Sequence, residues 1–211
     1  MNRRVSLAIA AATLLLGVAI ARWLFPRDGG SQRKRIDGGQ RRRTKTKRCD
    51  TGDGADSSLP QFIMLLGIPG SGKSTWSREF VFRCDASFTI VSSDEVRKKL
   101  CGSINDQTKN SEVWDVVLNQ CQGLLSSGRN VILDATNTST ERRRQFIKQL
   151  PPCRRFLKTF TINKSIAKAR LAKDLERGVE RAAVPDSVVD VMYRQFQDSV
   201  MAVRDEGWQT K

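Results

Sequence analysis

The most constraining feature of this chain is a glycine-rich stretch that follows a short apolar run. The run is FIMLLG, at residues 62–67, and the sequence continues through residues 67–76 as GIPGSGKSTW. This stretch matches the pattern GxxxxGK[S/T] at every fixed position. The pattern works between a buried strand and a helix, because inward-turned backbone N–H groups and the helix N-terminus together hold phosphates. The stretch therefore predicts an α/β fold with a phosphate-binding loop (P-loop).

Two side chains of this loop have specific expected tasks. Lys73 is expected to bridge the β- and γ-phosphates of ATP, and the Ser74 hydroxyl is expected to ligate Mg²⁺. A loop that merely turns a strand into a helix is the competing interpretation, and the flanking pattern disfavours it. ATP and Mg²⁺ are thus the predicted cofactors. The residues expected to bind the nucleotide are Gly67, Ile68, Pro69, Gly70, Ser71, Gly72, Lys73, Ser74 and Thr75.

From residue 61 onward, short apolar runs alternate with longer mixed stretches. The further runs FTIVSS, NVILDAT and FLKTFTI indicate buried strands. The stretches Glu112–Leu125 and Thr140–Leu150 have helical length. This alternation predicts a mainly parallel sheet with helices on both faces. We assign it to residues 61–211.

The N-terminus, residues 1–27, contains an uncharged run at Val5–Ala21 that is marginal for a membrane span, which needs about 20 apolar residues. Three interpretations compete. Residues 19–21 (AIA) resemble a signal-peptide cleavage site, and the arginines without acids suggest a mitochondrial presequence. We favour the third, an uncleaved single-pass membrane anchor through residues 5–25.

Residues 28–60 form a predicted disordered linker. They carry nine basic residues between Arg33 and Arg48 and show no hydrophobic periodicity. The positive-inside tendency places this flank, and the domain after it, on the cytosolic side, with a mitochondrial location as the alternative. The basic cluster could contact anionic lipid or nucleic acid, or act only as a topology signal.

The net charge, the cysteines and the absence of histidine limit the classes of function that this chain can have. The 37 Lys and Arg against 22 Asp and Glu give a formal charge of +15. A basic domain is compatible with a polyanionic partner, although solubility explains such charge equally well. The five cysteines lack CxxC spacing, which indicates free thiols. The absence of His excludes His-dependent triads and His-ligated zinc, so we expect no zinc.

A candidate acceptor site follows the second predicted strand, in the sequence SFTIVSSDEVRKKL. Asp94 lies at the carboxyl tip of that strand, where ligands gather in open α/β sheets. It could take the proton of an acceptor hydroxyl, and Arg97, one helical turn on, could bind an acceptor phosphate. The alternative makes Asp94 a helix cap and Arg97 a solvated surface charge.

Four segments together resemble the 5′-hydroxyl polynucleotide kinase family over roughly residues 61–208. They are GIPGSGKSTWSREF, SSDEVRK, VILDATNTSTERRR and RLAKDLERGVERAAVPDSVVDVMYRQF, in the family's order. The resemblance implies an α/β fold of the P-loop kinase type for residues 61–211, and it implies that Asp94 is the general base. It also implies that Arg97 contacts the phosphate 3′ of the acceptor nucleotide.

The third segment contributes Asp134, at the tip of its strand. This carboxylate suits a role at Mg²⁺, or in hydrogen bonding to an acceptor or lid arginine. Arg142, Arg143 and Arg144 follow on a predicted helix, and an exposed basic face is the favoured interpretation for them.

The fourth segment resembles the family's lid, at about residues 165–185, whose arginines close over the triphosphate. Arg177 and Arg181 are spaced i, i+4, so one helix face could present both, and an Arg in cis can stabilise the transferred phosphoryl group. Ion pairing on an exposed helix is the alternative, and Arg170 is a third candidate.

Together these features predict an ATP- and Mg²⁺-dependent kinase acting on a 5′-OH end of DNA or RNA. Asp94, Lys73, Arg97, Arg177 and Arg181 are its predicted catalytic residues, and Ser74 and Asp134 its metal site. The alternatives are a P-loop kinase for a small molecule, nucleotide or aminoacyl-tRNA, and a non-catalytic membrane-tethered nucleotide-binding protein. No DxDGT motif occurs, so we expect no 3′-phosphatase activity.

Overall fold

The computed structural model describes residues 58–84 and 87–210. The predicted membrane anchor and most of the predicted basic linker lie outside these residues. Within them, no helix has both the length and the apolar composition needed to cross a membrane.

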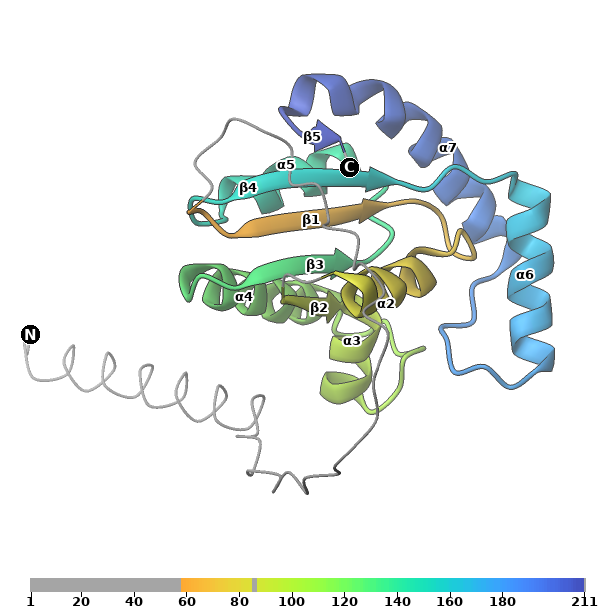
Figure 1. Ribbon diagram of the computed structural model, residues 1–211. Coiled ribbons are helices and arrows are strands. Elements are labelled where there is room, and N and C mark those ends of the chain that lie inside the picture. Colours follow the sequence, from red (N-terminus) through yellow and green to blue (C-terminus); the bar gives the residue numbers. More distant parts are fainter. Residues whose placement is uncertain (1–57, 85–86, 211) are drawn as a thin grey trace, which may run out of the picture. The chain divides into compact units, whose positions relative to one another are not determined.

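A five-stranded parallel sheet forms the centre of this domain, in the order β2-β3-β1-β4-β5 (Figure 1). The strands are β1 (Gln61–Leu66), β2 (Phe88–Ser92), β3 (Asn130–Asp134), β4 (Arg154–Thr159) and β5 (Gln209–Thr210). The helices are α2 (Lys73–Arg83), α3 (Ser93–Cys101), α4 (Asn110–Ser126), α5 (Thr140–Lys148), α6 (Lys164–Glu176), α7 (Asp186–Ala202) and the 3-10 helix η1 (Val203–Glu206).

Helices cover both faces of the sheet, as the alternating pattern predicted. Successive side chains of β1 point to opposite faces. Phe62, Met64 and Leu66 pack into a core with residues of α4, α5 and α7. Ile63 and Leu65 pack into a second core against α2. Burial on both faces explains why every residue of β1 is buried and why the strand carries an uninterrupted apolar run.

The four predicted strands are confirmed, with bounds that differ by one to three residues from the predicted runs, most at β4. Strand β4 begins at Arg154 rather than at Phe156, and it ends at Thr159. Strand β5 was not predicted, since two polar residues carry no periodic signal. The order of the strands brings the carboxyl ends of β2, β3 and β1 to one edge, and the P-loop, the start of α3 and the loop after β3 all begin there.

Three helices begin with a capping side chain, and the helix after the P-loop does not. The N-caps Ser92, Ser139 and Asn163 accept hydrogen bonds from backbone N–H groups of α3, α5 and α6. The N-cap of α2 is Gly72, in the left-handed conformation with φ 93°, and has no side chain to offer. The first N–H groups of α2 are therefore left available to a ligand.

Candidate functional site

The P-loop connects β1 to α2, and the side chain of its lysine folds back onto oxygen atoms of the loop itself. Lys73 Nζ donates to the carbonyl oxygens of Gly67 (2.9 Å) and Ile68 (2.8 Å), and to Ser71 Oγ (3.4 Å). Burial lowers the pKa of Lys73 from 10.5 to about 8. The ammonium group is thus satisfied by loop oxygens alone, and a bound phosphate would replace them as its partner.

Helix α6 packs closely against the P-loop at Gly70. A Cβ atom on Gly70 would lie 2.8 Å from the carbonyl oxygen of Ala167, and the residue has φ +78°. Arg170, one turn along α6, donates from Nη1 to the Gly70 carbonyl oxygen at 3.4 Å. Only glycine fits this position, because another residue would meet both a strained backbone and the backbone of α6.

The two residues predicted to hold Mg²⁺ lie together. Asp134 ends β3 with 8% of its surface exposed, and its carboxylate accepts a hydrogen bond from the Ser74 hydroxyl. Burial raises the pKa of Asp134, while the Ser74 hydroxyl and the positive charge of Lys73 oppose the rise. Mg²⁺ prefers oxygen ligands and usually takes only one or two from protein beside substrate phosphates. The Ser74–Asp134 pair therefore fits this ion.

Asp94 lies in the first turn of α3, but Ser92, not Asp94, caps that helix. The Asp94 carboxylate accepts a hydrogen bond from Arg97 Nη1 at 3.1 Å, and Arg97 Nη2 donates to Asn110 Oδ1 at 3.0 Å. Arg97 is buried, so its interpretation as a solvated surface charge is wrong. Its Nε atom is also buried and lacks a hydrogen-bond partner among the described residues.

The predicted lid consists of α6 and the loop after it, so the expected helix face shared by two arginines is wrong. Helix α6 ends at Glu176, and Arg177 is its C-cap. Gly178 follows with φ +65°, which turns the chain out of the helix. Arg181 lies in the loop and donates from Nη1 to Asp174 Oδ2. Arg177 is exposed.

The loop after α6 reaches the acceptor side of the site. Lys98 of α3 pairs with Glu180 at 2.5 Å, and the backbone N–H of Ala183 donates to Asn105 Oδ1 at 2.8 Å. The positive charge of Arg181 also acts on Lys73 and lowers its pKa further. Two of the three candidate lid arginines therefore lie near the P-loop: Arg181, whose charge acts on Lys73, and Arg170, which contacts the Gly70 carbonyl oxygen.

Four predicted residues share one electrostatic environment, centred on Lys73. The carboxylates of Asp134 and Asp94 raise the pKa of Lys73 and partly offset the effects of burial and of Arg181. Phosphoryl transfer needs a phosphate-binding lysine, a metal-binding carboxylate, a base for the acceptor and an arginine for the transferred group. The described site brings a candidate for each of these roles close together.

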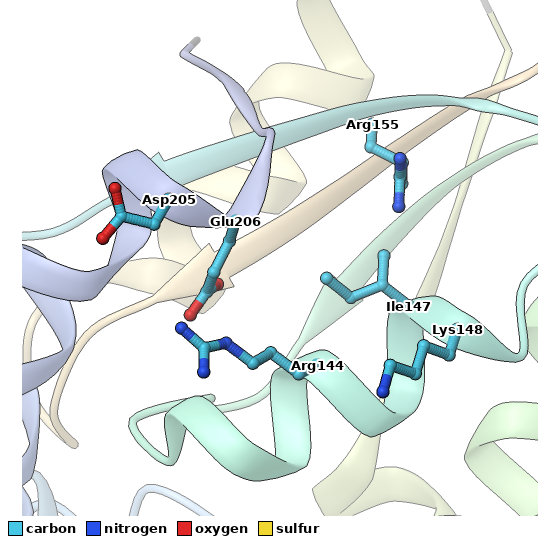
Figure 2. Close-up of a pocket in the computed structure, with 6 residues that line it drawn as sticks. All are labelled: Arg144, Ile147, Lys148, Arg155, Asp205 and Glu206. Carbon is cyan, nitrogen blue, oxygen red and sulfur yellow. The ribbon is translucent and has the colours of Figure 1, made fainter.

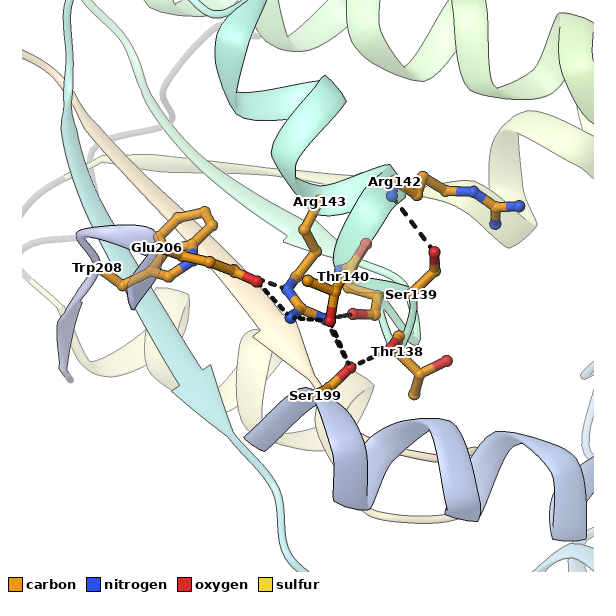
Figure 3. Close-up of polar contacts among 9 residues, drawn as sticks. Thr138, Ser139, Thr140, Arg142, Arg143, Ser199, Glu206 and Trp208 are labelled. Carbon is orange, nitrogen blue, oxygen red and sulfur yellow. Dashed lines mark hydrogen bonds and ion pairs between the residues drawn. The ribbon is translucent and has the colours of Figure 1, made fainter. Parts of the chain in front are cut away.

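The three arginines of α5 do not form a uniform exposed face, so that interpretation is wrong for Arg143. Its side chain is 1% exposed and pairs with Glu206 of η1 (Figure 3). Arg142 points away from this pair, and its guanidinium lies 5.1 Å from the ring centre of Trp114. The helical spacing of Arg143 with the buried Phe146 and Ile147 was the signal for burial.

A surface hollow of about 230 Å³ is lined by residues other than the predicted site residues, and Figure 2 shows its lining side chains. It is bordered by α5, by the start of β4 and by η1, and none of the predicted catalytic or nucleotide-binding residues lines it. The lining residues are Arg144, Ile147, Lys148, Arg155, Asp205 and Glu206. The candidate active site therefore lies at the P-loop, around Lys73, and not at this hollow.

Comparisons with known proteins agree with the P-loop architecture. A sequence model described as an AAA domain matches residues 62–198. A chain of the Pnkp1/Rnl/Hen1 RNA repair complex is similar at 24% identity with a TM-score of 0.59, covering 70% of this chain and 47% of that one. This chain thus spans about half the length of that relative.

Two further solved structures are similar at lower identity. A candidate kinase from Chloroflexus aurantiacus J-10-fl matches at 14% identity with a TM-score of 0.52, covering 64% of this chain and 78% of its own. A gluconokinase from Sinorhizobium meliloti 1021 matches at 18% identity with a TM-score of 0.44, covering 65% and 75%. The likeness to the Chloroflexus aurantiacus protein concerns the fold alone.

Proposed function

Because this chain belongs to the AAA domain family, with a P-loop kinase-type fold, we propose that it is an ATP- and Mg²⁺-dependent kinase for the 5′-hydroxyl end of DNA or RNA. The observation that carries the proposal is the shared environment of Lys73, Asp134, Asp94 and Arg181. A protein that only binds nucleotide needs the first two groups. Asp94 and Arg181 match the base and the charge-stabilising arginine that transfer of a phosphoryl group to an acceptor requires.

The donor half of the reaction is assigned to the P-loop, β3 and the lid. The N–H groups at the start of α2 and the Lys73 ammonium bind the β- and γ-phosphates of ATP. Ser74 and Asp134 hold Mg²⁺, which neutralises charge on those phosphates when it is bound. Arg181 contributes a positive charge in cis, where charge develops on the transferred group. Before it can bind that group, Arg181 must exchange Asp174 for phosphate oxygens.

The acceptor half is assigned to the first two turns of α3. The bond from Arg97 orients the Asp94 carboxylate, which takes the proton of the attacking hydroxyl. Asn110 fixes the other end of the guanidinium. For Arg97 to bind the phosphate next to the acceptor nucleotide, the acceptor must replace one of these two partners.

A polynucleotide acceptor is supported by the resemblance of the four segments and by the charge of the domain. Residues 61–211 carry 24 basic and 17 acidic residues, a net charge of +7. A small-molecule acceptor is the second candidate, because Lys73, Ser74 and Asp134 act on the phosphates of ATP and do not select the molecule that carries the accepting hydroxyl. The membrane anchor also remains a proposal, supported by the uncharged run Val5–Ala21.

The test is an acceptor panel offered to the full chain with Mg²⁺ and γ-labelled ATP. The panel holds 5′-OH DNA and RNA oligonucleotides, the same oligonucleotides with a 5′-phosphate as matched controls, nucleosides, and sugar acids such as gluconate. We expect label only on the 5′-OH oligonucleotides. Label confined to a small molecule would overturn the polynucleotide acceptor. ATP binding without any transfer would overturn kinase activity.

A further inference from the structure

The buried ion pair between α5 and the C-terminal η1 has no part in the mechanism above, yet it contacts the loop that supports the P-loop. A guanidinium group has five N–H donors. All five of Arg143 are used, with two donated to Glu206 (2.7 and 3.0 Å). The other three go to the Asn137 carbonyl (2.8 Å), to Ser199 Oγ (3.0 Å) and to Thr140 Oγ1 (3.1 Å).

Two of these contacts fix the loop between β3 and α5, residues 135–139. Arg143 holds the Asn137 carbonyl directly, and the Ser199 hydroxyl, which accepts from Arg143, donates to the Thr138 carbonyl (Figure 3). Asn137 has φ +50°, in the left-handed region that residues other than glycine seldom adopt. The surrounding contacts must therefore hold this loop in place.

The same loop contacts the P-loop and the strand before it. The Gly67 N–H donates to the Thr136 carbonyl at 3.1 Å, and the Asn137 side chain donates to the Leu65 carbonyl at 2.7 Å. The loop also follows Asp134 directly in sequence. Its position thus sets where the P-loop begins and where the metal-binding carboxylate lies.

Glu206 comes from the C-terminal segment, residues 199–208, which lies beyond the matched residues 62–198. Its carboxylate is fully buried and also accepts a hydrogen bond from Trp208 Nε1 at 2.8 Å. With both carboxylate oxygens bonded to Arg143, the guanidinium is fixed in one orientation.

We propose that Arg143, held by Glu206 and Ser199, is a positioning residue for the nucleotide site, and that residues 199–208 are part of the phosphate-binding apparatus. The inference rests on the proposed nucleotide site but not on the acceptor. If the Arg143–Glu206 pair only stabilised the fold, its loss would lower the fraction of folded molecules and leave their MgATP affinity unchanged. A positioning pair also sets the MgATP affinity of the folded molecules.

The test compares Arg143→Lys and Ser199→Ala with Arg142→Lys, the matched control on the same helix. MgATP binding is measured by calorimetry with the full chain, at a temperature well below each variant's thermal midpoint. Arg143→Lys keeps the charge for Glu206 but cannot supply five fixed donors. We expect it to weaken MgATP binding about tenfold. Ser199→Ala should weaken binding about threefold, and Arg142→Lys should change it less than twofold.

Hydrogen exchange at the Gly67 amide gives a second readout that needs no nucleotide. We expect this amide to exchange faster in Arg143→Lys and Ser199→Ala, and unchanged in Arg142→Lys. If Arg143→Lys does not fold, Ser199→Ala decides the question. Wild-type affinity and protection in a folded variant of Arg143 or Ser199 would overturn the inference. A wild-type protein that does not bind MgATP would overturn the proposed function, and Gly67 exchange would still test the positioning role.

Discussion

The pKa of Lys73 predicts that nucleotide binding takes up a proton. In the free protein, burial lowers this pKa to about 8. Contact with phosphates favours the charged form, so in the complex the pKa should return to about 10 or above. Because the bound form has the higher pKa, the affinity is at its full value well below pH 8 and falls as the pH rises from about 8 to about 10. At pH 8, binding should take up about half a proton.

The size of the effect follows from the fraction of Lys73 that is charged before binding. With a pKa of about 8 this fraction is about 90% at pH 7 and about 10% at pH 9. MgATP affinity should therefore fall about tenfold between these pH values, or about 1.4 kcal/mol. Calorimetry in two buffers with different ionisation enthalpies measures both the affinity and the protons taken up.

Lys73→Arg is the control, because an arginine keeps its charge throughout this range. We expect this variant to bind MgATP more weakly, with an affinity that is independent of pH between 7 and 9. A wild-type affinity that changes less than twofold over the same range would refute the reasoning. If the MgATP affinity of Lys73→Arg also fell tenfold between pH 7 and 9, the titrating group would not be Lys73.

Two further predictions follow from the lid. Arg181→Ala should lower kcat about 100-fold, because the Arg181 charge acts on Lys73, whereas the exposed Arg177→Ala should change it less than about threefold. Equal losses in steady-state kinetics would contradict this assignment. Gly70→Ala should weaken MgATP binding as well as stability, because α6 would have to move away. Gly128 is the matched control, because it has a similar φ of +77° but a Cβ there would lie in open space. Gly128→Ala should cost only about 1–2 kcal/mol of stability in thermal unfolding. A loss of MgATP binding in Gly128→Ala as large as that in Gly70→Ala would contradict the role of α6.

The sequence predicted those parts of the fold and site whose signal is local. The P-loop, its strand and its helix follow from neighbouring residues in one stretch. The proximity of Ser74 and Asp134 follows from a general rule, that the carboxyl ends of parallel strands meet at one edge of the sheet. Asp94 and Arg97 were predicted to lie on one helix, because a single helical turn separates them in sequence.

Two of the three features that sequence reasoning missed depend on partners far along the chain. Arg143 is buried because Glu206, 63 residues away, neutralises it. Asn110 was not predicted as the second partner of Arg97, since that contact joins two helices. The end of α6 was a local feature, since Gly178 is a common signal for helix termination, but the i, i+4 spacing of Arg177 and Arg181 suggested a continuous helix.

The central claim is that Asp94 deprotonates an acceptor hydroxyl opposite the P-loop. Its most direct test is single-turnover phosphorylation of a 5′-OH oligonucleotide, comparing the wild-type protein with Asp94→Asn. Loss of a general base typically costs 100- to 10,000-fold in rate. We expect a fall of at least about 100-fold in the transfer step, with MgATP affinity within about threefold of wild type. An undiminished transfer rate in Asp94→Asn would contradict the assignment of Asp94 as the general base.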